Sequence, residues 1–463
     1  MTNGFTYKKA YMKLFSILSE LRGKGFPAPQ VCFYLAPQTR GCGTGNLMQL
    51  WEELYENRIY EELYFHWKGK PLIICHSHRA IPREIKEFFT WRTPTWNAPK
   101  RENTWAWEGN PQKVSWDEEG NPEEIVVSVV RNASSPDYHG TERDTSSMSA
   151  AYWGVPIYGR SWHDGAKDTR ENASHYGFQF AEQAETALKL DPPVAFLCQW
   201  NEWLVPFLTK YTYDAPYYGN HDIILRDEYN EEYSRDLEPM KGGYKDAYYL
   251  QMADFCRRFK GLPAPARANG MHTVDVNGDF SVWQNILPIY REYTGDLAPR
   301  NAQAYDAIGR YERNTGRNEF AELRVAADEA SVSFYAKCTN DIENDADDSM
   351  VLWLCLPDGK IPAWEGYSFV VNRKKCGSGK ALLERCSENG TYRFETVAEI
   401  PCRVLRNEMM MTIPRLMIGI PDGSFRLDFK WSDQLPSGDI MDFYIDGDAA
   451  PRGKMRYIYL FDA

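Results

Sequence analysis

Several patterns that would each define a class of protein are missing from this sequence. None of its 10 cysteines stands in the close pairs that zinc ribbons need, which excludes that kind of structural zinc site. No run rich in lysine and arginine occurs, and a formal net charge of -12 argues against a nucleic-acid partner, because the phosphate backbone repels negative charge. No apolar stretch approaches the length of a membrane span.

Two further absences concern export and redox state. The first residues lack the charged and then apolar layout of a secretory signal, and neither half contains an internal repeat. The cysteines are scattered, and several lie in apolar segments, where they resemble small core residues. Only Cys376 and Cys386, which flank a Gly/Ser turn, are placed to form a disulfide, so the redox compartment stays undetermined.

The chain has enough apolar residues for two domains. Its 463 residues with 43% hydrophobic content exceed one ordinary core. Aromatic residues make up 14% of the chain, and flat aromatic faces are what polysaccharide-handling proteins use for stacking. Neutral sugars are compatible with the acidic charge.

The first half alternates amphipathic and strand-like segments. We predict helices over 8–22, 47–62 and 177–190, and strands over 30–36, 71–76, 88–91, 125–130, 194–200 and 222–225. This alternation is typical of a TIM-type (β/α) barrel, and the count of six strands indicates that the first βα units are absent. We therefore expect a (β/α) barrel domain over 1–262.

A different texture follows residue 262. The composition shifts to Pro, Ala and Gly, and we interpret 263–272 as a linker. Beyond it, short runs of alternating polarity are separated by Gly, Asp and Asn turns. We expect a β-sandwich over 273–463, so that the fold class is α/β plus all-β.

The most informative segment is 199–204, Gln-Trp-Asn-Glu-Trp-Leu, which follows an apolar run. It places the carboxylate of Glu202 between the indoles of Trp200 and Trp203, with the amide of Asn201 beside them. At a barrel strand end these groups offer a sugar a stacking face, a hydrogen-bond partner and an acid/base group. The alternative is a capped strand end whose tryptophans belong to the core.

Four motifs carry a resemblance to a known family. They are residues 67–74 (Trp-Lys-Gly-Lys-Pro-Leu-Ile-Ile), 159–165 (Gly-Arg-Ser-Trp-His-Asp-Gly), 200–203 (Trp-Asn-Glu-Trp) and 232–239 (Glu-Tyr-Ser-Arg-Asp-Leu-Glu-Pro). In these motifs the chain resembles uncharacterised Bacteroides-type glycoside-hydrolase-like barrel proteins, distantly related to glycoside hydrolase family 99 (endo-α-mannosidase) and family 71. The resemblance implies a hydrolase of polysaccharides or complex glycans that is secreted, periplasmic or at the cell surface. It also implies that an N-terminal part of the barrel, with any export signal, precedes residue 1.

The second half resembles family 9 carbohydrate-binding modules in residues 274–283 and 364–373. The resemblance implies a domain that raises the local concentration of substrate. Its tryptophans are candidate stacking platforms, with a position in the core as the alternative for each: Trp283, Trp353, Trp364 and Trp431.

Glycoside hydrolysis generally needs two carboxyl groups, and Glu202 is the first candidate. In family 99 a second glutamate stands three residues further on, where this chain has Val205, so the family's pair is not reproduced. The candidates for the partner carboxylate are Asp227, Glu232, Asp236 and Asp164. For 232–236 the alternative is a loop ordered by pairing of arginine with carboxylates.

The remaining candidates are groups at strand ends and in loops that we expect to bind the substrate: His76, His78, Arg92, Trp107, Asn132, His163 and Asp164. The spacing of His76 and His78 is also that of barrel metallohydrolases, for which only His163 and Asp227 offer further ligands. We expect no metal and no cofactor, and keep a metal-dependent hydrolase as a third hypothesis.

The sequence therefore predicts a glycoside hydrolase in which Glu202 is the general acid/base and Asp227 its first partner, with Glu232 next. The rival hypothesis is a polysaccharide-binding protein that keeps an aromatic cleft without a competent pair of carboxylates. A glycan is the expected partner, whereas the sugar, the linkage and the oligomeric state are not determined by the sequence.

Overall fold

The chain divides into two compact units, Met1–Leu262 and Pro263–Ala463, which are described separately. The computed structural model describes residues 6–35, 42–76, 80–95, 103–107, 112–129, 159–201, 207–209, 223–225, 231–232, 234–240, 243–262, 264–297, 300–303, 310–313, 316–356, 360–420, 422–434, 438–445 and 447–462. Among these residues no helix combines the length and the apolarity that crossing a membrane requires.

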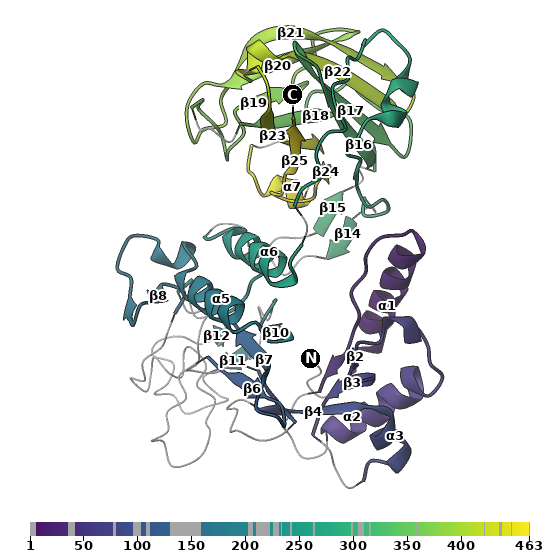
Figure 1. Cartoon of the computed structure of the whole chain (residues 1–463), viewed down its shortest axis with the longest axis vertical. Helices are drawn as coiled ribbons and strands as arrows, with labels where there is room; N and C mark the ends of the chain where they lie inside the picture. Colours follow the sequence, from purple (N-terminus) through teal and green to yellow (C-terminus); the bar gives the residue numbers. More distant parts are fainter. Residues whose placement is uncertain are drawn as a thin grey trace. The chain divides into compact units, whose positions relative to one another are not determined.

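Helices flank the strands of the first unit (Figure 1). They are α1 (Lys8–Gly23), α2 (Cys42–Leu50), α3 (Arg83–Phe88), α5 (Phe178–Leu190) and α6 (Ala247–Lys260), with short turns η1 (Trp51–Tyr55), η2 (Glu61–Leu63) and η3 (Ala173–His175). The helices predicted over 8–22 and 177–190 are confirmed as α1 and α5. The third, predicted over 47–62, is not one helix, because α2 ends at Leu50 and the π-helical turn η1 follows.

A parallel sheet forms from the first strands of the unit. Its strands are β1 (Phe33–Tyr34), β2 (His66–Trp67), β3 (Lys70–Ile74), β4 (Thr90–Thr95) and β5 (Thr104–Ala106). β1, β3, β4 and β5 lie in that order and are parallel, and β2 pairs with β3 in the antiparallel sense.

A second, separate sheet has the order β10-β7-β6. Its strands are β6 (Val114–Trp116), β7 (Pro122–Val127) and β10 (Val194–Leu197). β7 and β10 are parallel, but β6 is antiparallel to β7. The other short strands form two-stranded antiparallel hairpins: β8 (Trp162–His163) with β9 (Ala166–Lys167), and β11 (Phe207–Thr209) with β12 (Ile223–Leu225).

The predicted TIM-type barrel followed by a sandwich is wrong. The structure is mostly sheet, with 23% of it helical, and its largest sheet is an antiparallel one that curls in the second unit. In the first unit β6 occupies the edge of β7 that a barrel would give to a parallel neighbour. The strand predicted over 222–225 belongs to a hairpin and not to a parallel ring. A period of alternating apolar residues indicates a strand but not its partner, which explains the error.

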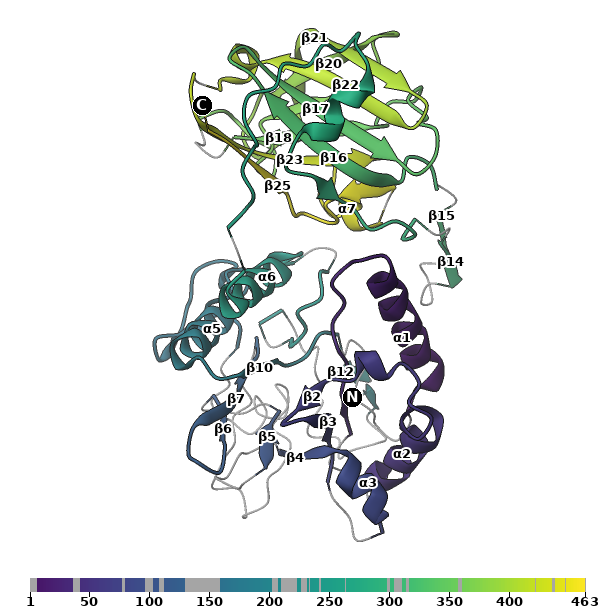
Figure 2. The same cartoon turned by 45° about the vertical axis from the view of Figure 1, so that its right-hand side comes forward.

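Both sheets of the first unit bury one face against helices and one against each other. α1, α2 and α3 pack on the first sheet, and α5 and α6 pack on β7 and β10, as both cartoon views show (Figure 2). Between the sheets lies an aromatic cluster in which the ring of Tyr34 is 5.6 Å from that of Trp107 and 6.0 Å from that of Phe196. This cluster joins the two sheets without a shared backbone ladder.

The second unit is built on one antiparallel sheet of eleven strands. The strands are β13 (Tyr290–Arg291), β16 (Phe320–Ala327), β17 (Ser331–Cys338), β18 (Val351–Cys355), β19 (Phe369–Val371), β20 (Lys380–Cys386), β21 (Phe394–Leu405), β22 (Glu408–Pro414), β23 (Phe425–Asp433), β24 (Asp448–Ala450) and β25 (Tyr457–Phe461). A hairpin of β14 (Arg300–Gln303) and β15 (Arg310–Arg313), the 3-10 turns η5 (Phe280–Asn285) and η7 (Arg415–Ile418), and the short helix α7 (Asp442–Ile445) complete it.

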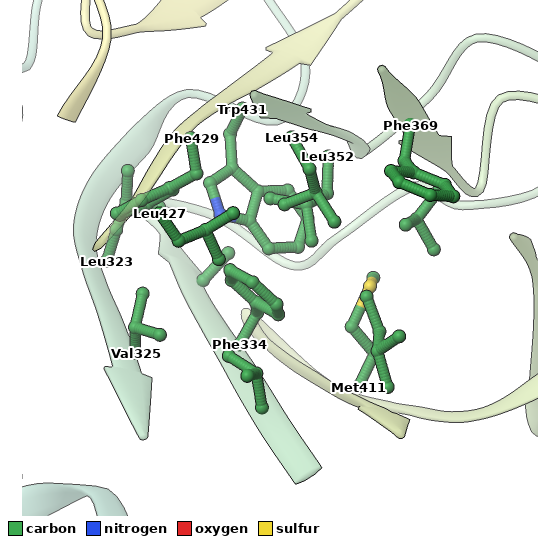
Figure 3. Packing of buried hydrophobic residues seen from close by; sticks show 14 of the residues in the cluster. Leu323, Val325, Phe334, Leu352, Leu354, Phe369, Met411, Leu427, Phe429 and Trp431 are labelled. Carbon is green, nitrogen blue, oxygen red and sulfur yellow. The ribbon is translucent and has the colours of Figure 1, made fainter. Parts of the chain in front are cut away.

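One long strand lets this sheet curl in place of splitting into two. β21 has 12 residues; its residues 394–401 pair with β20 and its residues 402–405 with β22. Because the same strand belongs to both halves, the sheet curls and the side chains on its concave face pack against one another. Side chains from facing parts of the sheet, such as Phe334, Phe429 and Trp431, point toward one another in this core (Figure 3).

The outer faces of the curled sheet are also covered. Trp283 stacks on Tyr335 at a ring distance of 5.2 Å, and Trp353 packs among the residues of a separate cluster with Trp364. Trp283, Trp353, Trp364 and Trp431 are the four tryptophans of this unit, and all of them are buried. For each of the four tryptophans a position in the core, the alternative to a stacking platform, is thus confirmed. Cys376 and Cys386 are free thiols, so the proposed disulfide is not formed.

The core of the curled sheet generates a stability prediction. Phe334 is fully buried and its ring lies 5.9 Å from that of Phe429. We expect Phe334→Ala to lower the free energy of unfolding by about 3–5 kcal/mol, because it leaves a cavity. Urea titration of the full chain measures the change. Leu416→Ala is the control, since Leu416 is 88% exposed and its loss should change the free energy by less than about 0.5 kcal/mol. Equal effects of the two substitutions would contradict this description of the core.

Candidate functional site

Three of the sequence motifs meet at the carboxyl ends of β7 and β10. The carbonyl oxygen of Trp200 accepts the backbone N–H groups of Leu237 at 3.1 Å and Glu238 at 3.0 Å. The backbone N–H of Arg160 in turn donates to the carbonyl of Glu232 at 2.9 Å. The segments around residues 160, 200 and 232–238, far apart in the sequence, therefore form one continuous site.

A left-handed residue turns the chain at the end of β10. Cys198 is buried and still bonds to the carbonyl of Val127, but Gln199 has a φ of 68°. Such a backbone costs a residue with a side chain about 1–2 kcal/mol, so the surroundings must hold it. After this turn Trp200 is 43% exposed and Asn201 is exposed as well. The indole lies 5.9 Å from the ring of Tyr249, which supports it from α6.

The carboxylate of Glu232 is held by one of its two oxygens. Its Oε1 accepts the hydroxyl of Ser161 at 2.6 Å and the backbone N–H of Ser161 at 3.2 Å. Both hydrogen bonds that the described residues donate to this carboxylate go to Oε1. Gly159 makes this approach possible, because a Cβ atom at that position would collide with the Glu232 side chain. The orientation of this carboxylate is thus set by the turn at 159–161.

The buried side chain of Arg160 holds the same turn in place from the interior of the first unit. Its guanidinium is fully buried and lies 4.2 Å from the ring centroids of both Tyr244 and Tyr248. The Nη2 donates to the Ser234 hydroxyl at 3.1 Å and to the Asp236 carbonyl at 2.8 Å. A buried cation held by aromatic rings, side-chain hydroxyls and one backbone carbonyl gives this loop a fixed position.

Helix α5 holds the strand end beside this turn. The side chain of Gln183 accepts the N–H of Ser128 at 3.2 Å and donates to its carbonyl at 2.6 Å, which closes the end of β7. The N–H of Gln179 donates to the carbonyl of Arg160 at 3.2 Å. Two buried glutamines on one helix therefore position both β7 and the 159–161 turn, and a helical pattern alone does not reveal that role.

His163 and Asp164 lie together in the β8–β9 hairpin. The imidazole contacts the carboxylates of Asp164 at 2.9 Å and Asp168 at 3.1 Å, and these hydrogen bonds raise the pKa of His163. Asp164 itself is 92% exposed. His163 and Asp164 follow Ser161, the residue that contacts Glu232, by two and three positions in the chain, and their own contacts are with Asp168 and Glu182.

His76 is exposed after β3, and partial desolvation lowers its pKa. Among the described residues no group of three or more His, Cys, Asp or Glu side chains could hold a metal ion. Five predicted site residues lie outside the described residues: His78, Asn132, Glu202, Trp203 and Asp227.

Arg92 and Trp107 are buried in the structure and not on an open cleft. Trp107 belongs to the aromatic cluster between the two sheets. Arg92 forms a buried ion pair with Glu123, and its Nε lies 2.8 Å from Oε2. Burial alone would raise the pKa of Glu123, but hydrogen bonds from Arg92, Trp105 and Trp67 lower it to about 2.

The neighbouring residue has the opposite protonation state. Glu124 is fully buried, and its Oε2 accepts the Ser115 hydroxyl at 2.7 Å and the N–H of Ala106 at 3.3 Å. Burial raises the pKa of Glu124 to about 8. Neither glutamate was among the predicted site residues, although two adjacent acidic residues at the start of an apolar strand are a signal of buried charge.

Comparisons of the chain with protein-family models, with curated proteins and with solved structures found no match.

The pair Glu123 and Glu124 predicts a dependence of stability on pH. Glu124 has a folded pKa of about 8 against an ordinary 4.5, so its stabilising effect is present below pH 4.5 and lost as the pH rises toward 8. The slope approaches about 1.4 kcal/mol per pH unit within that range. Glu124→Gln should reduce this dependence of the free energy of unfolding on pH, which urea unfolding at several pH values measures.

Glu123→Gln is the comparison variant. Ionised Glu123 stabilises the folded protein above its ordinary pKa of 4.5, and this stabilisation is lost as the pH falls toward 2. Its replacement leaves Arg92 buried and unpaired, which should cost about 3–5 kcal/mol at neutral pH. An unchanged slope in Glu124→Gln would show that Glu124 is ionised in the folded protein.

Proposed function

We propose that the chain is a glycoside hydrolase whose site lies at the carboxyl ends of β7 and β10. The observation that carries the proposal is the pair of backbone hydrogen bonds that Leu237 and Glu238 donate to the carbonyl of Trp200, which brings Trp200 beside the segment that follows Glu232. An exposed indole, an exposed amide and a carboxylate held by one oxygen are the groups that bind and cleave a glycosidic bond. The resemblance of the motifs to glycoside-hydrolase-like proteins distantly related to family 99 implies the same class of reaction, although the pair of neighbouring glutamates of that family is not reproduced.

Each group has a role in this proposal. Trp200 stacks on a sugar ring and Asn201 binds its hydroxyls. Glu202, next in the chain, protonates the leaving oxygen as general acid. Glu232 attacks the anomeric carbon or activates a water through Oε2, while Ser161 holds Oε1. A carboxyl separation of about 5–5.5 Å corresponds to retention of configuration and one of about 6.5–9.5 Å to inversion.

The proposal assigns the glycan contacts to the first unit. All four tryptophans of the second unit are buried, so none of them is a stacking platform on its surface. A carbohydrate-binding role of the second unit would have to use other side chains, and it stays a prediction from the resemblance to family 9 modules.

The first test is a screen of plant and host-glycan polysaccharides with the wild-type chain and single variants. Glu202→Gln and Glu232→Gln should each lower the rate of sugar release by roughly 10²–10⁴-fold, because each removes an acid/base or nucleophilic group. Glu185→Gln is the matched control, since this exposed carboxylate on α5 pairs with Arg258 on α6 and its variant should retain the wild-type rate.

Asp227→Asn separates the two candidates for the partner carboxylate. If it abolishes activity while Glu232→Gln does not, the partner is Asp227, and Glu232 only orders the loop through Ser161. Wild-type activity in Glu202→Gln would exclude the proposed mechanism altogether.

Ser161 provides a second prediction on the same carboxylate. Ser161→Ala removes the 2.6 Å hydrogen bond to Oε1, so kcat should fall by roughly tenfold with little change in KM. Ser161→Thr keeps a hydroxyl and should recover most of the rate. Ser234→Ala, which removes a bond to Arg160 instead, is the control. A change in KM alone would contradict the assigned role.

A second candidate function is glycan recognition without hydrolysis. It is favoured by Val205, which stands where family 99 has its second glutamate, and by the engagement of Glu232 with Ser161. In that case calorimetry detects binding of a glycan to the wild-type chain, but no sugar is released. Trp200→Ala should then weaken the binding.

A further inference from the structure

An exposed aromatic side chain, Tyr176, lies on a loop that contacts the residue before Glu232, because His175 pairs with Glu231. Tyr176 is 52% exposed, yet its ring stacks on Phe178 at 5.4 Å with an interplanar angle of 30°. The guanidinium of Arg170 lies 5.4 Å from the Tyr176 ring and 5.0 Å from that of Phe178. The ring is therefore held in place from within the protein while more than half of the residue faces solvent.

The backbone that carries Tyr176 is fixed as well. Its carbonyl accepts the side chain of Gln251 at 2.7 Å, and the hydroxyl of Tyr248 donates to the carbonyl of Ser174 at 2.5 Å. The next residue, Gly177, has a φ of 65°, and a Cβ atom there would collide with Gln251. A platform whose ring and backbone are both held loses little entropy when a ligand stacks on it.

Two contacts connect this ring to the proposed site. His175, directly before Tyr176, pairs with Glu231 at 2.9 Å, and Glu231 directly precedes Glu232. Tyr248, which holds the backbone at Ser174, also lies against the guanidinium of Arg160. The loop of Tyr176 and the loop of Glu232 are thus neighbours within the first unit.

The charges around the ring indicate which sugars it accepts. The Nε of Arg170 donates to Oδ1 of Asp168 at 3.1 Å and to its Oδ2 at 3.0 Å, and the Nη2 of Arg170 donates to the same Oδ2 at 2.6 Å. The carboxylate therefore neutralises the charge of the guanidinium. Asp164 and Glu231 are further exposed carboxylates of this region, and each contacts a histidine, His163 and His175, at 2.9 Å. The carboxylates around the ring repel a uronate or a sulfated sugar, so a neutral pyranose is the favoured occupant.

We infer that Tyr176 is a second stacking platform, a subsite for a neutral sugar residue of the glycan away from the bond that is cleaved. The inference rests on the proposed function and adds to it a minimum chain length for full activity. Tyr176 stacks on one residue of the chain, and Trp200 stacks on another next to the carboxylates. Short substrates reach only Trp200, whereas longer ones reach both rings.

The test compares substrates of increasing length. A size ladder of neutral oligosaccharides is prepared from the polysaccharide that the wild-type chain cleaves, and kcat/KM is measured for each member. Tyr176→Ala should lower kcat/KM for long members by roughly three- to tenfold and leave the shortest cleaved member unchanged. Tyr176→Phe keeps the ring and should behave as the wild type. Tyr7→Ala, at 55% exposure on α1, is the matched surface control.

The outcomes separate the two proposals. If the wild-type chain cleaves glycans and Tyr176→Ala is indistinguishable from Tyr7→Ala at every length, the subsite is wrong and the function stands. If Tyr176→Ala lowers the rate equally for short and long members, the residue acts at the cleavage site and the distal subsite is again wrong. If no glycan is cleaved, calorimetry with manno- and gluco-oligosaccharide ladders repeats the comparison as binding. Absence of both cleavage and binding overturns the proposed function and the subsite together.

Discussion

The hydrogen bonds that Leu237 and Glu238 donate to the carbonyl of Trp200 hold the candidate site together. They keep the chain after β10 in the turn that begins with the left-handed Gln199, and they bring the loop of Glu232 to the same edge. Ser161 then orients one carboxylate from a third segment. Without these bonds the exposed indole and the carboxylate would belong to unrelated loops, and the candidate site would not form.

Buried charge organises the first unit around that edge. Arg160 between two tyrosine rings fixes one loop, and Arg92 with Glu123 fixes the interior near β4. Glu124, one residue further on, is buried and pairs with no cation among the residues that the structure describes, and it stays protonated because desolvation is the largest influence on its pKa. Adjacent carboxyl groups with opposite ionisation show that the local partner, and not the residue type, determines the charge state in this interior.

The second unit follows a different principle. Its curled sheet is covered on both faces, and its tryptophans all serve the cores. The length of β21 lets one sheet close on itself where two packed sheets were expected. An aromatic count taken from the sequence therefore overstates the stacking surface of this unit, because a wide two-sided sheet needs large side chains to fill its layers.

The sequence by itself determined the elements that local pattern controls. Helices α1 and α5 and the central strands stand close to where periodicity places them, and the motifs at 159–165, 200–203 and 232–239 contain residues of the candidate site. Only the tertiary structure decided which strands pair, since β6 takes the edge of β7, and which polar groups are exposed, since Arg92 is buried and Tyr176 is not. The physical reason is that periodicity reports which face of an element is apolar, whereas pairing, burial and charge state depend on contacts between segments distant in the chain.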